Sequence, residues 1–254
     1  MIAVQKILLT GHRGFIGSKL YNKLAHTDLV GLDLLDGNDL LTCELPNDNF
    51  DLIIHLAGRS GVRESMRDPG AYWRNNVEAS RRLFERYPET RILYASSSSA
   101  YEPDLNPYAA SKYIIEELAE RYPKTLGMRL HTVWSETPRK GMLLDKLFNN
   151  NLEYVTNHHR DFIHINDVCD AIQILINKPH VRGVLDIGSG NPIKIRNLAP
   201  NAPIRLNTPN ERTFTCANTE KMKVLGFKPK YNIEKYLTKS NKCTILNITN
   251  GEPA

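Results

Sequence analysis

A tyrosine and a lysine four residues apart carry the clearest chemical signal in the sequence. Tyr108 and Lys112 lie in the stretch NPYAASKYIIEEL, whose pattern predicts a helix over 108–121. Residues four apart lie on one face of a helix, and an ammonium group beside a phenol favours the ionised phenolate. A tyrosine whose pKa is lowered in this way can take a proton from a hydroxyl group as a hydride leaves.

Several serine hydroxyls precede this pair at the end of a predicted strand. The stretch ASSSSAY (95–101) overlaps the end of the strand predicted over 91–97. Parallel sheets bind their ligands at the carboxyl ends of the strands. A serine run alone is typical of a loop, and a lone pair such as Tyr108 and Lys112 is typical of a helix surface. Their combination with the glycine pattern described next predicts an active site.

Three glycines near the start of the chain predict a phosphate-binding turn. In TGHRGFIGSKL, Gly11, Gly14 and Gly17 follow a predicted strand and open a predicted helix. The first glycine permits a tight turn, the second lets a pyrophosphate approach the backbone, and the third lets the helix pack closely. The phosphates would face the helix N-terminus, where free N–H groups favour negative charge. The pattern therefore predicts a bound dinucleotide.

An aspartate indicates which dinucleotide is bound. Asp33 ends the second predicted strand, and no arginine adjoins it in the sequence. A carboxylate at this position can accept a hydrogen bond from a ribose 2′-hydroxyl, and it repels a 2′-phosphate. The sequence therefore predicts NAD rather than NADP.

The elements that must position these groups alternate along the first half of the chain. We expect strands over 6–10, 29–33, 52–58, 91–97 and 126–133, and helices over 16–25, 71–86 and 108–121. Strands that alternate with helices imply a parallel sheet covered on both faces. The interval between Asp33 and Asp51 is too short for a crossover helix, so a loop is expected there.

The pattern loosens after about residue 134, which predicts a smaller second lobe. Small elements are expected in NLEYVTN (151–157) and NIEKYL (232–237), and the last residues, 243–254, are expected to be frayed or loosely packed.

Composition restricts the classes of protein that fit. The chain has 254 residues, a net charge of +5 and 41% hydrophobic residues. Its four cysteines are scattered, so we expect neither a disulfide framework nor a metal site, and a cytoplasmic location. It has no signal-peptide pattern and no apolar stretch of the ~20 residues that span a bilayer. The mild positive charge suits an anionic small molecule, and no basic block predicts nucleic acid binding.

The chain resembles the extended short-chain dehydrogenases/reductases, in particular their nucleotide-sugar epimerases and dehydratases. The resemblance covers nearly the whole sequence. Its motifs are TGHRGFIGSKL, HLAGRSGVRESMRDPGAYWRNNV (55–77), SSSAY followed by PYAASK, RDFIHINDVCDAI (160–172), DIGSGNPIKI (186–195) and KVLGFKP (223–229). It implies an α/β fold with a Rossmann-type, doubly wound parallel sheet and a smaller C-terminal substrate-binding lobe. The NAD-binding domain would comprise 1–134 plus 162–187, and the nucleotide-sugar-binding lobe 135–161 plus 188–254.

The resemblance implies a role for each matching residue. Tyr108 would be the base, Lys112 would hold the nicotinamide ribose and lower the tyrosine pKa, and Ser97, four residues before Tyr101, would hydrogen-bond the reacting oxygen. The residues implied to bind NAD are Gly11, Arg13, Gly14, Phe15, Ile16, Gly17, Asp33, Asp39, Leu56, Ala57, Gly58 and Lys112. The connection from Tyr101 to Tyr108 is shorter than in typical members, so the sugar needs cover from elsewhere.

The residues after Ser97 discriminate among the reactions of the family. A 4,6-dehydratase carries an Asp-Glu pair where this chain has Ser98 and Ser99. Related decarboxylases have a glutamate, and 3,5-epimerising reductases a cysteine, at the position of Ser99. Exclusion therefore favours 4-epimerisation through a 4-keto sugar with tightly bound NAD. The alternatives are a nucleotide-sugar 4-ketoreductase that releases its cofactor and a non-catalytic NAD-binding protein.

A local match suggests the substrate. HTVWSETPRKGM (131–142) resembles the segment of UDP-glucuronate 4-epimerases that holds the sugar carboxylate, which implies this role for Thr132 and Arg139, with Ser98 and Ser99 as further hydroxyl donors. A UDP-linked uronate is thus one expected substrate, and a neutral UDP-hexose or N-acetylhexosamine is the alternative. Relatives often form homodimers through the helices that correspond to 71–86 and 108–121.

Overall fold

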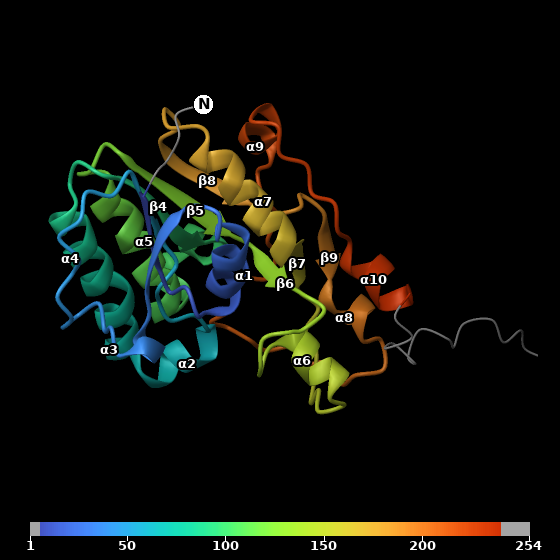
Figure 1. The fold of residues 1–254 in the computed structure, drawn as a ribbon. Helices are drawn as coiled ribbons and strands as arrows, with labels where there is room; N and C mark the ends of the chain where they lie inside the picture. Colours follow the sequence, from blue (N-terminus) through green and yellow to red (C-terminus); the bar gives the residue numbers. More distant parts are fainter. Residues whose placement is uncertain (1–5, 240–254) are drawn as a thin grey trace, which may run out of the picture.

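A six-stranded parallel sheet forms the centre of the computed structural model, which describes residues 6–239. Its order is β2-β1-β3-β4-β5-β8, and every neighbouring pair is parallel (Figure 1). The strands are β1 (Lys6–Thr10), β2 (Asp28–Leu32), β3 (Leu52–His55), β4 (Arg91–Ser97), β5 (Thr125–Leu130) and β8 (Gly183–Ile187). The predicted α/β fold with a Rossmann-type parallel sheet is confirmed.

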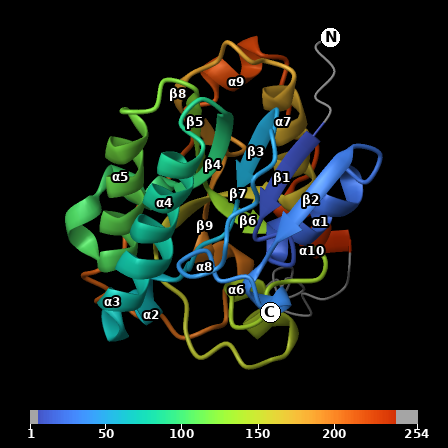
Figure 2. The same ribbon diagram turned by 60° about the vertical axis from the view of Figure 1, so that its left-hand side comes forward.

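Helices cover both faces of this sheet because successive strand residues point to opposite sides. Ile7 and Leu9 pack in one core with α1 (Phe15–Lys23) and α7 (Ile165–Ile176). Leu8 packs in the other core with α4 (Ala79–Arg86) and α5 (Pro107–Ala119). Figures 1 and 2 show α4 and α5 together on the side opposite α1 and α7.

The strand order reverses next to β1, and this reversal places the binding crevice. The chain passes from β1 outward to β2 and then returns to pair β3 with the other edge of β1. In open α/β sheets, ligands bind where the connections diverge, beyond the carboxyl ends of the strands. The loops that follow β1 and β3 therefore frame the expected cofactor site.

The connection from β2 to β3 contains only a single turn of 3₁₀ helix, Leu34–Asp36, in agreement with the expected loop. The sheet is covered here by buried side chains of the loop instead of by a helix. These side chains are Leu40, Leu45 and Phe50.

The strand expected over 126–133 is wrong as a single element. β5 ends at Leu130, and Thr132–Trp134 forms β6, which belongs to a second, three-stranded sheet. β6 pairs in parallel with β7 (His159–His164), and β9 (Pro192–Lys194) pairs antiparallel with β7. The apolar run is continuous across the break, so hydrophobicity alone carries no sign of the change of sheet.

The helix expected over 71–86 is also subdivided. It comprises α3 (Pro69–Tyr72), a π-helical turn over Trp73–Glu78, and α4. The π-helical turn buries Asn76, whose side-chain oxygen lies beside Gly58.

The small sheet is accompanied by short helices. These are α6 (Leu143–Phe148), α8 (Ile195–Leu198) and α10 (Ile233–Lys239). α9 (Glu220–Val224) packs its Met222 into the core of the large sheet, and α2 (Val62–Arg67) also belongs to the large lobe. The element expected over 151–157 is reduced to one bridge between Val155 and Ile204, and that expected over 232–237 lies in α10. The expected tail, 243–254, lies outside the described residues.

Candidate active site

The glycine turn after β1 is so tight that side chains do not fit in it. Gly11 has a φ of +72°, and a Cβ on Gly17 would lie 1.9 Å from the Gly11 carbonyl oxygen. The first turn of α1 is thereby pressed onto the loop that precedes it. Gly17 is needed here for close packing of the helix onto the turn, in line with the role expected for the third glycine.

The N-terminus of α1 has the features that a diphosphate requires. Gly14 is the N-cap of α1 and has no capping side chain. The first N–H groups of the helix, those of Phe15 and Ile16, therefore have no capping acceptor from Gly14. A Cβ on Gly14 would have the Gly11 carbonyl oxygen, at 3.1 Å, as its one close neighbour in the described part of the chain, outside α1 and the adjoining residues. The backbone is thus open on this side, and the turn fits the pyrophosphate of NAD.

Asp33 closes the other side of this turn. One carboxylate oxygen accepts from the Arg13 backbone N–H and the other from the Leu35 N–H, both at 2.9 Å. Asp33 therefore stands directly beyond β2 and beside the glycine turn. Asp39 lies farther along the loop, where its carboxylate accepts from the Leu41 N–H at 2.9 Å, and its contact with the cofactor stays a prediction.

The segment after β3 connects the glycine turn to Lys112 of α5. The Leu56 and Ala57 N–H groups donate to the backbone and side-chain oxygens of Thr10, at 3.1 and 3.4 Å. A Cβ on Gly58 would lie 2.9 Å from the Asn76 side-chain oxygen and 3.6 Å from the Lys112 ammonium nitrogen. Gly58 thus permits the loop to pass directly beside Lys112.

Lys112 is a buried cation held by a backbone carbonyl. Its side chain donates to the Ala95 oxygen at 2.9 Å, and the residue is only 6% exposed. Burial lowers the pKa of Lys112 from 10.5 to about 8, although the nearby Glu116 carboxylate acts to raise it. The ammonium group therefore faces the loop at Gly58 and has few neighbours that balance its charge.

Tyr108 and Ser97 are hydrogen-bonded to each other at the start of α5. The Ser97 oxygen accepts from the Ser99 N–H at 3.1 Å, which leaves the Ser97 hydrogen free for the phenol. Asn106 caps the helix by accepting from the Ala109 N–H at 2.8 Å. This cap fixes the first turn of α5, from which Tyr108 projects.

The pKa of Tyr108 departs from the sequence-based expectation. It is raised by burial, while the hydrogen bond with Ser97 and the positive charge of Arg139 act to lower it. We expected a pKa lowered by Lys112, and this is wrong for the structure without ligands. Spacing places Lys112 on the correct helix face, but its ammonium group is turned to the Ala95 carbonyl.

Arg139 approaches Tyr108 from the small lobe. Its guanidinium donates to the Ser60 hydroxyl, and its charge acts on Tyr108. Tyr72 completes the group, because its hydroxyl donates to the Ser60 backbone oxygen at 3.0 Å and its ring lies 6.0 Å from the Tyr108 ring. Ser60 and Tyr72 were not singled out from the sequence; the signal for them was their position within the motif 55–77.

Three other residues were expected to bind the substrate: Ser98, Ser99 and Thr132. Ser98 is buried, Ser99 is partly exposed, and Thr132 is partly exposed at the start of β6. The Ser98 carbonyl accepts from the Arg212 guanidinium at 2.6 Å, and Arg212 also donates to Glu102 at 2.7 Å. Arg212 thus covers the short connection after Ser97, and nothing in its local sequence indicates this contact.

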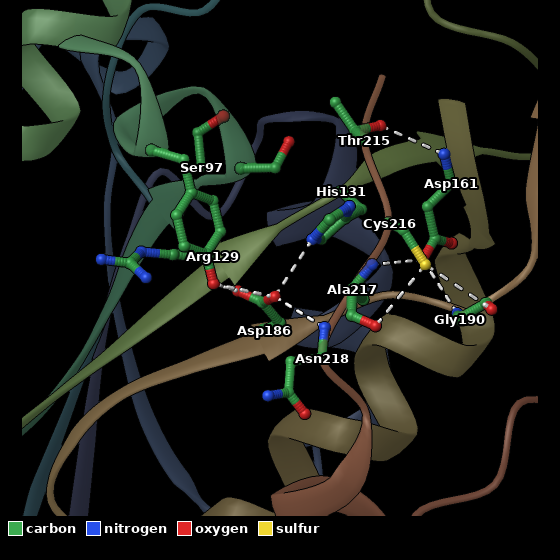
Figure 3. Close-up of polar contacts among 12 residues, drawn as sticks. Ser97, Arg129, His131, Asp161, Asp186, Gly190, Thr215, Cys216, Ala217 and Asn218 are labelled. Atoms are coloured by element: carbon green, nitrogen blue, oxygen red, sulfur yellow. Dashed lines mark hydrogen bonds and ion pairs between the residues drawn. The ribbon is translucent and has the colours of Figure 1, made fainter. Parts of the chain in front are cut away.

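Two buried carboxylates anchor the segment that carries Arg212. Asp161 is fully buried and accepts from the N–H groups of Ser189, Gly190 and Ala217 at 2.7 to 2.9 Å. Asp186 accepts from the Asn218 N–H at 2.8 Å. Figure 3 shows Asp161 with Gly190 and Ala217, and Asp186 with Asn218, at the junction of the two sheets.

A groove of about 330 Å³ lies between α2 and residues 205–211. It is rich in arginine, because Arg63, Arg67 and Arg205 line it. Tyr154 lies between two of them, with guanidinium carbons of Arg63 and Arg205 at 5.2 and 5.0 Å from its ring centre. The groove adjoins the start of α5, since the side chain of its N-cap Asn106 donates to the Asn210 carbonyl at 3.0 Å.

The fold and this site define a dinucleotide-binding protein with a Ser-Tyr-Lys group at the carboxyl ends of its strands. The chain belongs to the NAD-dependent epimerase/dehydratase family, whose family model matches residues 7–188. NAD is the cofactor of this family, in agreement with the prediction from Asp33. An uncharacterised protein of Methanocaldococcus jannaschii is 30% identical, and the match covers 82% of this chain and 76% of the relative.

Solved structures show the same fold. MoeE5 in complex with UDP-glucuronic acid and NAD is 26% identical, with a TM-score of 0.77 over 92% of this chain and 96% of that chain. The UDP-glucuronic acid 4-epimerase of Bacillus cereus is 24% identical, with a TM-score of 0.79 over 92% of this chain and 97% of that one. Among residues 6–239 no helix is long and apolar enough to cross a membrane.

Proposed function

We propose that the protein is a nucleotide-sugar 4-epimerase that acts on a UDP-linked uronate, UDP-glucuronate or UDP-galacturonate. The observation that carries the substrate assignment is the position of Arg139, which reaches Ser60 beside the catalytic tyrosine. We also propose that residues 1–134 plus 162–187 bind NAD and that 135–161 plus 188–254 bind the nucleotide sugar. β7, at His159–His164, spans one of these boundaries.

Tyr108 and Ser97 would move the proton of the reaction. The Ser97 hydroxyl is oriented by the Ser99 N–H and can hold the sugar oxygen, while Tyr108, as its phenolate, takes the proton from that oxygen to become the phenol and later returns it. NAD, when bound, supplies the acceptor and donor of the hydride. Lys112 and the loop at Gly58 would hold the nicotinamide side of the cofactor.

A uronate carboxylate would replace Ser60 as a partner of Arg139. A guanidinium binds a carboxylate through two parallel hydrogen bonds, which are stronger than its single bond to a neutral hydroxyl. Ser99 and Thr132 are both partly exposed and can add hydroxyl donors. A carboxylate held still in this way resists decarboxylation while the sugar is in its 4-keto form. MoeE5, solved with UDP-glucuronic acid and also with UDP-glucose, supports a UDP-sugar substrate by similarity.

The arginine-rich groove suits the nucleotide diphosphate. Arg63, Arg67 and Arg205 supply positive charge, and arginine matches phosphate geometry in two-pronged hydrogen bonds. The aromatic ring of Tyr154 offers a flat face in the same groove. Because the groove adjoins Asn106 at the start of α5, a diphosphate bound there lies next to the sugar site.

The test is turnover of a panel of UDP-sugars, followed by NMR for C4 epimers without added cofactor. We expect interconversion of UDP-glucuronate and UDP-galacturonate. Arg139→Ala should lower kcat/KM for the uronate by about 10-fold to 100-fold and change turnover of UDP-glucose little, because it removes a charge-assisted contact worth ~1.5–3 kcal/mol. Lys140→Ala is the matched control, since Lys140 is the neighbouring exposed cation.

Other outcomes would support the alternatives. Net reduction of a 4-keto sugar that requires added reduced cofactor would indicate a ketoreductase. NAD binding with no turnover of any UDP-sugar would indicate a non-catalytic protein. Equal loss of both substrates in Arg139→Ala would contradict the carboxylate contact but leave the epimerase assignment intact.

A homodimer through α4 and α5 remains a prediction. The exposed face of α4 carries a charged group in which Arg81 contacts Glu78 at 2.9 Å and Glu85 at 2.7 Å. Sedimentation of the purified protein would determine whether this face is covered by a second copy.

A further inference from the structure

Two basic residues, Arg13 and His12, stand beside Asp33. Although no arginine adjoins Asp33 in the sequence, the fold brings Arg13 to it, because the Arg13 N–H donates to the Asp33 carboxylate at 2.9 Å. His12 precedes Arg13 and lies on the same turn, where its ring packs against Gly31 and lies 5.1 Å from the Tyr21 ring. An arginine near the end of β2 is what Rossmann proteins use to accept the 2′-phosphate of NADP.

Both side chains contact a second carboxylate, that of Asp36. The Arg13 guanidinium donates to one Asp36 oxygen, and the His12 Nε2 lies 3.2 Å from the other. Asp36 belongs to the 3₁₀ turn Leu34–Asp36 that directly follows Asp33. The turn is closed at Gly37, whose φ of +80° permits the left-handed end of the turn.

Asp33 is poorly placed to bind the Arg13 guanidinium by itself. Each of its two oxygens already accepts a backbone N–H, from Arg13 and from Leu35. It can still repel a phosphate, but the Arg13 side chain extends past it to Asp36. A 2′-phosphate carries about two negative charges and would compete for that guanidinium.

From this arrangement we infer that Asp36 is a second residue that determines cofactor choice. By binding Arg13, it keeps the guanidinium from a 2′-phosphate and so disfavours NADP, while Asp33 favours the 2′-hydroxyl of NAD. The inference concerns the cofactor, and it holds whichever sugar is the substrate.

The experiment measures the affinities of NAD and NADP for cofactor-stripped protein by calorimetry. Asp36→Asn keeps the size of the side chain and removes its charge. We expect it to bind NADP about 10-fold more tightly than wild type and NAD within about 2-fold, because one charge-assisted contact becomes available to the phosphate. Asp28→Asn is the matched control, since it removes an exposed carboxylate at the opposite end of β2. It should change neither affinity.

A double-mutant cycle with Arg13→Met tests whether Arg13 is the residue that binds the 2′-phosphate. The gain in NADP affinity from Asp36→Asn should disappear when Arg13 is also replaced. In the Asp36→Asn single variant, which retains Arg13, the gain in NADP affinity should also shrink at high salt. The contact between Arg13 and the 2′-phosphate would be exposed and therefore screened. Unchanged NADP affinity in Asp36→Asn, a gain that persists without Arg13, or loss of NAD binding in Asp36→Asn would each overturn the inference.

Discussion

Replacement of Lys112 by methionine should change how the stability of the cofactor-free protein depends on pH. Lys112 is 6% exposed, and burial lowers its pKa to about 8 in the folded state, from 10.5 in the unfolded chain. Between these values the unfolded chain binds more protons than the folded protein. The free energy of unfolding of the wild type therefore rises with pH across this window, and the rise should be absent from Lys112→Met.

The magnitude follows from the two pKa values. With 1.36 kcal/mol for each pKa unit, the charged form of Lys112 costs the folded protein about 3 kcal/mol at neutral pH. From about pH 7 to about pH 9.5 the wild type should recover about 2 kcal/mol of this cost. At neutral pH the methionine also loses the bond to the Ala95 carbonyl, an offset of about 1 kcal/mol.

The assay is urea unfolding of wild type and Lys112→Met at both pH values. The difference between the two proteins cancels the titration of groups that they share. Lys221→Met, on the exposed surface of α9, is the control that removes a lysine without removing a buried charge. If the wild type and Lys112→Met respond to pH in parallel, the ammonium group is not desolvated as the structure implies, and the reasoning fails.

Two further predictions concern the active site and the junction of the sheets. Tyr108→Phe should lower turnover by about 10²-fold to 10⁴-fold and retain NAD, because it deletes the proton acceptor and leaves the glycine turn intact; epimerisation near the wild-type rate, with NAD content measured by absorbance, would contradict this role. Asp161→Asn should lower the free energy of unfolding by about 3 kcal/mol, because an amide nitrogen would face backbone N–H groups that now donate to a carboxylate. Thermal or urea unfolding would check it, and a loss below ~1 kcal/mol would contradict the buried hydrogen bonding.

Features with a local cause could be predicted from the sequence. The glycine turn depends on spacing within seven residues, Gly11 to Gly17, and the clash of a Cβ with the Gly11 carbonyl explains why that spacing is informative. The parallel sheet could be predicted because strands and helices alternate over the first half of the chain. The capped start of α5, with Asn106 followed by Pro107, is likewise a local signal that places Tyr108 on the first turn.

Features that depend on packing between distant segments could not be predicted from the sequence. Arg139 contacts Ser60, which lies 79 positions earlier in the chain, and no pattern in either segment indicates the other. The direction of the Tyr108 pKa depends on how much solvent the surrounding elements exclude, which spacing does not contain. The same holds for the proximity of Arg13 to Asp33, since the turn and the end of β2 meet only when the strands pair.

The route of the chain between the two sheets limits how such a protein can be divided. After β5 the chain leaves the large sheet, forms β6, α6 and β7 in the small lobe, and returns through α7 to complete the large sheet with β8. α7 packs in the same core as β1, so the small lobe combines a segment inserted before α7 with a segment, including β9, that follows β8. No single cut yields a complete cofactor domain. An exchange of the small lobe between relatives would therefore have to replace the segment between β5 and α7 together with the segment after β8.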